Sequence, residues 1–82
     1  MRKFNALGNI EIDEKKGFAL FSLNPKIYSL NRIYSAVSSI MEKSCVILDG
    51  SPEEEVLVEI RETGKDKIKG LVLEFSRLLI KK

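Results

Sequence analysis

The single cysteine of this 82-residue chain, Cys45, is the first candidate for a chemically reactive side chain. It lies in the short apolar run 44–48, and the chain contains no histidine that could deprotonate its thiol. A thiol in an apolar strand usually packs as a small hydrophobic side chain, whereas a reactive thiol needs a polarising neighbour. We therefore expect Cys45 to be a core residue, with no internal disulfide and no cysteine metal cluster.

Three adjacent carboxylates, Glu53, Glu54 and Glu55, follow the turn-forming residues 49–52. Carboxylate oxygens could bind a hard cation, but contiguous residues lack the alternating spacing by which a calcium loop brings its ligands to one ion. A solvated charged turn is therefore the favoured interpretation. Because histidine, the commonest general base and metal ligand, is absent, we predict no catalytic residue, no metal site, no cofactor and no enzymatic activity.

A basic cluster, Lys65, Lys67 and Lys69, stands at the start of a predicted helix. Helix N-termini and lysines can together hold a phosphate group, but only Gly64 and Gly70 flank this cluster, without a glycine-rich phosphate loop. Anion binding by these lysines is one hypothesis.

The charges of the chain are unevenly distributed. Residues 44–62 carry six acidic side chains and one basic one, whereas residues 63–82 carry six basic and two acidic ones. Two interpretations remain open, namely intramolecular charge balance and a basic surface for an acidic partner. The second, using the Lys65–Lys69 cluster and Lys81-Lys82, would make the chain a small nucleic-acid-binding domain. The aromatic residues fall mostly on core-forming faces, so no base-stacking platform is predicted.

The elements that position these residues begin with a predicted hairpin. Ile10–Asp13 alternates apolar and polar residues, and Gly17 supplies the positive φ that a tight turn requires before the strand Phe18–Leu23. Both faces of this second strand are largely apolar, so we expect it to be central or covered on both sides. Pro25 cannot donate to a ladder and ends the strand.

A helix follows, with Ser29 as its predicted N-cap and Tyr28 and Ile33 as a hydrophobic staple. Its apolar residues recur at offsets of 3, 4, 7, 10 and 11 from the first, which describes one helical face. They are Leu30, Ile33, Tyr34, Val37, Ile40 and Met41.

The second half repeats this order with strands at 44–48 and 55–62 and a last helix that Asp66 is predicted to cap. The same offsets recur in Ile68, Leu71, Val72, Phe75, Leu78 and Leu79. We predict one α+β domain over residues 1–82, with 1–9 loosely ordered: a four-stranded antiparallel sheet with two helices on one face, in ββαββα order.

Leu57, Leu73 and Ile80 do not fit the predicted core faces. If they are exposed, they mark a protein- or peptide-binding surface or a homodimer contact. Alternatively, Leu73 and Ile80 cover the segment Phe4–Leu7. The edges of a four-stranded sheet can also accept an extended peptide by strand addition.

We expect a cytoplasmic protein. The longest apolar runs, such as Phe18–Phe21, are about four residues, far short of the roughly 20 that a membrane helix needs. The segment Phe4–Leu7 is too short for the core of a signal peptide, because Gly8 and Asn9 end it.

The run from Leu20 to Leu79 resembles the HxsD family, the small accessory protein of the His-Xaa-Ser peptide-modification system. The resemblance lies in the segments FALFSLN, KIYSLNRIYSAV, CVILD, EVLVEI and EFSRLL. The residues that fit the family pattern are Tyr28, Ser29, Leu30, Ile33, Ala36, Glu74, Phe75, Leu78 and Leu79.

The sequence departs from the family pattern at two places. Ser76-Arg77 stands where the family has Asn-Glu, and Ser39-Ile40-Met41 replaces an aromatic helix end. The resemblance implies a non-catalytic partner of radical SAM maturation proteins that act on a peptide.

Overall fold

A computed structural model describes residues 9–51 and 53–80 of the chain. The first half contains strands β1 (Asn9–Asp13) and β2 (Phe18–Leu23) and helix α1 (Leu30–Ile40). The second contains strands β3 (Ser44–Ser51) and β4 (Glu55–Glu62) and helix α2 (Ile68–Ile80). This ββαββα order confirms the predicted α+β fold. The predicted lead-in over residues 1–9 lies outside the described residues except for Asn9.

The four strands form one antiparallel sheet in the order β1-β2-β4-β3. The two hairpins therefore meet through β2 and β4, and β1 and β3 are the edges. In the central pair, Phe21 lies opposite Val58. In the second hairpin, Val46 lies opposite Ile60 and Ile47 lies opposite Glu59. The central position predicted for β2 is thus confirmed.

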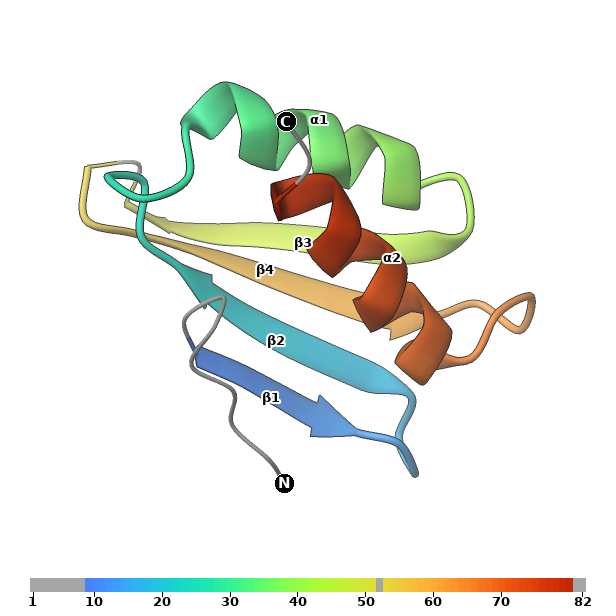
Figure 1. Ribbon diagram of the computed structural model, residues 1–82. Coiled ribbons are helices and arrows are strands. Elements are labelled where there is room, and N and C mark those ends of the chain that lie inside the picture. The colour runs from blue at the N-terminus through green and yellow to red at the C-terminus, as the bar shows by residue number, and fades with distance from the viewer. Residues whose placement is uncertain (1–8, 52, 81–82) are drawn as a thin grey trace.

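Both helices cover the same face of the sheet (Figure 1). Strand side chains alternate between faces, so the covered face receives every second residue of each strand. Phe21 of β2 and Phe75 of α2 meet there edge to face, with ring centroids 4.7 Å apart. The buried core comprises Ile10, Ala19, Phe21, Leu23, Ile33, Ala36, Val37, Ile40, Val56, Val58, Ile60, Ile68, Leu71, Val72, Phe75 and Leu79.

Two of the predicted local signals are confirmed. Ser29 caps α1, since its Oγ accepts a hydrogen bond from the Arg32 N–H at 3.2 Å. Gly17 has φ +71°, a conformation that glycine adopts without the steric cost of a Cβ.

The cap predicted for α2 lies at a different residue. The first N–H of the helix, that of Ile68, donates to Glu62 Oε2 at 2.6 Å, and not to Asp66. Glu62 ends β4, so this bond ties the last strand directly to the last helix. Its negative charge also complements the positive end of the helix dipole.

The structure corrects three further expectations. Strand β3 continues through Asp49 and Gly50 to Ser51, where the sequence suggested a turn. Cys45 is exposed rather than part of the core, because it points to the helix-free face of an edge strand. Tyr34 and Met41 belong to the apolar stripe of the first helix but are exposed.

Among the described residues, no helix is both long enough and apolar enough to cross a membrane.

Candidate functional site: the outer edge of strand β3

The outer edge of β3 carries backbone groups that point away from the sheet. The N–H of Glu62 donates to the Gly17 carbonyl at 2.8 Å, so the backbone groups of Glu62 face β2. Because these groups alternate along an antiparallel strand, Arg61 and Glu59 face β3 and pair with Cys45 and Ile47.

It follows that the N–H and C=O groups of Ser44, Val46 and Leu48 point outward from the sheet. No strand within residues 9–51 and 53–80 pairs with this edge. Such a row of donors and acceptors is a template for an added strand.

Apolar side chains flank this edge on both faces of the sheet. Ile47 is 47% exposed on the helix-free face, and Leu48 is 45% exposed on the helix-covered face. The exposed side chains of Tyr34 and Met41, seven residues apart, lie along α1. Tyr34 and Leu48 line a shallow hollow with Gly50. An added strand would therefore find both hydrogen-bonding groups and apolar contacts.

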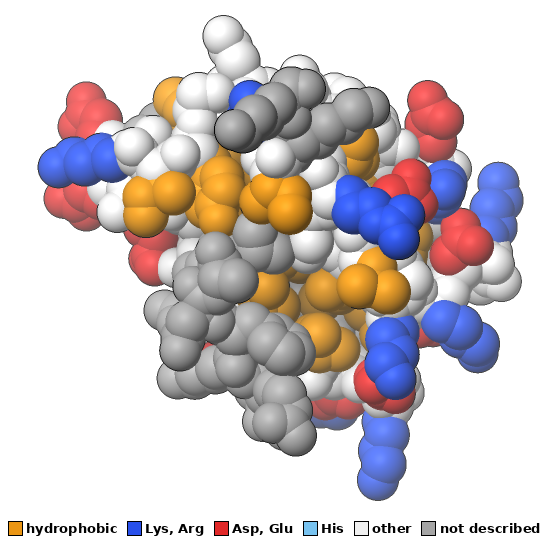
Figure 2. All heavy atoms as spheres, in the orientation of Figure 1, with side chains coloured by type: hydrophobic (Ala, Val, Ile, Leu, Met, Phe, Trp, Pro, Cys, Tyr) orange, Lys and Arg blue, Asp and Glu red, His pale blue; other side chains and the backbone are white. Residues whose placement is uncertain are grey.

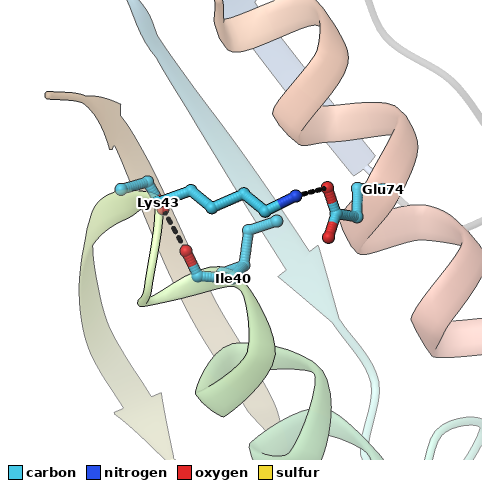
Figure 3. A network of polar contacts seen from close by, with 4 residues as sticks. Ile40, Lys43 and Glu74 are labelled. Atoms are coloured by element: carbon cyan, nitrogen blue, oxygen red, sulfur yellow. Dashed lines mark hydrogen bonds and ion pairs between the residues drawn. The ribbon is translucent and has the colours of Figure 1, made fainter. Parts of the chain in front are cut away.

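The cation that directly precedes β3 in the sequence is engaged with α2. Lys43, just before the strand, places its Nζ 2.7 Å from Glu74 Oε1 of α2 (Figure 3). Its backbone N–H donates to the Ile40 carbonyl at 3.0 Å and so closes the turn between α1 and β3. The hydrogen bond to Glu74 raises the pKa of the Lys43 ammonium above its usual value. Charged side chains often protect sheet edges, but this one is held toward α2.

The three apolar residues singled out from the sequence do not share one surface. Leu73 and Ile80 are 60% and 59% exposed on α2. Leu57 is half-buried, and its neighbours Val56 and Val58 are buried beneath the helices. Since successive strand side chains alternate, Leu57 lies on the opposite, helix-free face. A partner that covers Leu73 and Ile80 would not reach Leu57.

The helix-free face combines apolar and charged side chains. Leu20, Glu59 and Ile47 are neighbours across three strands. Arg61 Nε lies 2.5 Å from Glu59 Oε2, and its guanidinium lies 5.5 Å from the centre of the Phe18 ring. This mixture is typical of an antiparallel sheet with one face toward water.

The lysine cluster surrounds the start of α2. Lys65, Lys67 and Lys69 are exposed around the start of α2, but the Ile68 N–H already donates to Glu62. The carboxylate thus occupies a position that a bound phosphate would use. Figure 2 shows Lys and Arg side chains interspersed with Asp and Glu around the rim of the helix-covered face. Lys81 and Lys82 lie outside the described residues.

The other candidate chemical groups remain dispersed. Glu53, Glu54 and Glu55 are exposed at the connection between β3 and β4. In the part of the chain that the structure describes, no three Cys, Asp or Glu side chains gather as a metal site would require. The β3 edge is the feature that combines outward backbone N–H and C=O groups with exposed apolar side chains.

Comparison of the chain with protein-family models, with curated proteins and with solved structures finds no match.

Proposed function

We propose that this chain is a non-enzymatic protein- or peptide-binding domain whose binding site is the outer edge of β3. The observation that carries the proposal is the outward row of backbone groups at Ser44, Val46 and Leu48, beside exposed apolar side chains. In binding by strand addition, main-chain hydrogen bonds supply affinity and alternate side chains supply selectivity. The β3 edge offers both elements on a rigid sheet.

The resemblance to the HxsD family supports a more specific version of this proposal. In that version the chain is a cytoplasmic accessory domain that contacts radical SAM maturation proteins or the His-Xaa-Ser peptide on which they act. Its segment CVILD, one of those on which the resemblance depends, is the central part of β3.

The nucleic-acid alternative has less support from the geometry. Glu62 bonds the N-terminal N–H of α2, and acidic side chains intersperse with the lysines. Nucleic-acid binding would show itself as an affinity that falls steeply with added salt. We expect no such affinity for DNA or RNA.

An NMR titration tests the proposal. The isotope-labelled chain is titrated with a radical SAM maturation protein, with a His-Xaa-Ser peptide, and with a synthetic peptide of residues 44–51 that carries serine at the cysteine position. We expect shifts of the backbone amides of 44–49 with at least one of these probes. The Leu48→Pro variant removes one outward N–H without removing a bond to β4, and should weaken binding.

Shifts confined to α2 around Leu73 and Ile80, or no shifts with any of these probes in a monomeric chain, would contradict the proposed site. A matched control is Leu73→Ser, which removes exposed apolar area from α2 and should leave binding at β3 unchanged.

A further inference from the structure

We infer that the β3 edge is occupied by a second copy of this chain, so that two sheets join into one through antiparallel pairing of β3 with β3. The inference rests on the proposed function, because it takes the β3 edge as a binding site and names its occupant. The register of the two strands, the charge of β3 and the position of α1 support this pairing.

Backbone geometry limits the registers that two copies can adopt. The outward groups belong to Val46 and Leu48, so these residues must meet outward residues of the second copy. Three symmetric registers satisfy this condition, centred on Val46, on Ile47 or on Leu48. In each, the same patch is used by both copies, as two-fold symmetry requires.

The register centred on Ile47 pairs residues 44–50 of the two strands and is the one of the three that places Val46 opposite Leu48. It pairs Val46 with Leu48 of the second copy and Leu48 with Val46, so each outward N–H and C=O of these residues gains a partner. Ile47 then lies directly opposite Ile47 across the two-fold axis. The apolar residues of β3 thereby cover one another on both faces of the joined sheet.

The charges of the strand are compatible with this register. Asp49 is the sole charged residue of β3 and would lie opposite Cys45 of the second copy. Cys45 is small and uncharged, so Asp49 meets no like charge there, and the two Asp49 side chains lie apart. Arg61, the neighbour of Cys45 on β4, is held by Glu59 and by the Phe18 ring of β2. This register therefore brings no like charges together at the interface.

Helix α1 adds a second complementary contact. Tyr34 lines the hollow beside Leu48 and Gly50, whereas Met41 follows Ile40, whose carbonyl accepts from Ser44 Oγ at 2.8 Å. The helix therefore runs antiparallel to β3. In the register centred on Ile47, Gly50 faces Ser44 of the second copy, which brings Tyr34 beside the Met41 end of the other α1. Thioether sulfurs pack favourably against aromatic rings.

Cysteine cross-linking tests which residues of the two β3 strands lie opposite each other. In a Cys45→Ser background, Ile47→Cys places two thiols opposite each other across a pair with Cα atoms about 4.5 Å apart. This separation lies within the range that a disulfide spans. Val46→Cys and Leu48→Cys are the matched controls, since each would cross-link only in one of the other two registers.

We expect mild oxidation to give at least tenfold more covalent dimer with Ile47→Cys than with either control. The unaltered chain should form little, because its two Cys45 residues would be separated by four residues, about 13 Å along the strands. A dimer mass in sedimentation should accompany this result. Preferential cross-linking at position 46 or 48 would overturn the register.

Charge substitution at the two-fold axis gives an independent test that does not depend on oxidation. Ile47→Lys and Ile47→Glu should each be monomeric, because like charges would face each other across the axis. An equimolar mixture should form a heterodimer. Circular dichroism melting confirms that each variant is folded.

The outcomes separate this inference from the proposed function. A monomer at all concentrations, or a dimer that Ile47→Lys leaves intact but Leu73→Ser disrupts, would overturn pairing through β3. In the monomer case, binding of a radical SAM protein or His-Xaa-Ser peptide at 44–49 would leave the proposed function standing. Failure of every probe at that edge, together with a monomeric chain, would overturn both.

Discussion

The two edges of the sheet differ in length, in charge and in the exposure of their apolar side chains. β1 is five residues long and carries the charged residues Glu11 and Asp13, and Ile10 is 1% exposed. β3 is eight residues long, and Ile47 and Leu48 are both exposed. Natural sheets protect their edges with short strands and charged side chains. β1 follows that practice more closely than β3, and this difference is the basis of our proposal that the outer edge of β3 binds a partner.

The largest expected effect is a difference in the free energy of unfolding that is lost when an apolar residue of each edge strand is truncated. Ile10→Ala should lower the free energy of unfolding by about 2–4 kcal/mol, because it leaves a cavity in the core. Ile47→Ala should cost less than about 1 kcal/mol when measured at dilute concentration, since the side chain is half exposed. Urea denaturation of the two variants measures both values. Equal losses would mean that β3 is as deeply integrated as β1, and the contrast between the edges would fail.

A second prediction concerns two glycines with positive φ, Gly50 near the end of β3 and Gly17 in the turn after β1. Gly50 has φ +93°, and a Cβ there would lie 2.3 Å from the Glu55 carbonyl oxygen. Gly50→Ala should therefore destabilise the fold by at least about 2 kcal/mol. At Gly17 the nearest atom would be Glu62 Oε1 at 2.8 Å, a side-chain atom that yields more readily than backbone but belongs to the carboxylate that accepts from the Ile68 N–H. Gly17→Ala should therefore cost about 1–2 kcal/mol.

Gly70 provides the matched control for these two substitutions. It lies in α2, and nothing stands within 4 Å of a Cβ at that position. Gly70→Ala should raise stability by up to about 1 kcal/mol in thermal or urea unfolding. If Gly17→Ala proved more costly than Gly50→Ala, the turn after β1 would be more constrained than the end of β3, and this prediction would be wrong.

Sequence reasoning identified most of the fold because local signals agreed with one another. The alternation in Ile10–Asp13, the Ser29 cap and the repeated helical spacing each pointed to the element that formed. The strand order was harder, since it depends on which strands of the two hairpins meet beneath the helices. The α2 cap was misassigned because Glu62 is remote from the helix in sequence and reaches it only through the fold.

The candidate site was largely missed, and the reason is physical. Tyr34 and Met41 fit the apolar stripe of α1, and an apolar strand such as 44–48 suggests burial. Their exposure follows from the edge position of β3, which no local pattern specifies. One signal was present, because the run Cys45–Leu48 has no polar residue on either face. The sequence left open whether Leu73 and Ile80 are exposed; both are exposed on α2, and not at the β3 edge.

The smallest expected effect concerns the ion pair that holds Lys43 toward α2. Glu74→Gln should release Lys43 beside the start of β3 and weaken self-association less than tenfold, because the charge lies at the end of the paired segment. Glu14→Gln, in the β1–β2 turn, is the matched control and should have no effect. Sedimentation at several protein concentrations measures both, and tighter association of the Glu74 variant would contradict this role.

The pH dependence of this ion pair follows from the raised pKa of Lys43. A group whose pKa is raised on folding stabilises the folded state at pH values below its pKa in the unfolded chain. That pKa is 10.5 for this lysine. The contribution is lost only as the pH rises from there through the folded pKa. The effect of Glu74→Gln should therefore be constant between about pH 6 and pH 8.

Amide hydrogen exchange as a function of protein concentration tests the central claim most directly. The N–H groups of Val46 and Leu48 point outward, whereas those of Cys45 and Ile47 already face β4. Raising the concentration should therefore slow the exchange of Val46 and Leu48 selectively, with no change for the amides of β1. Rapid exchange of Val46 and Leu48 at every concentration, or protection that appears instead in β1, would contradict the account.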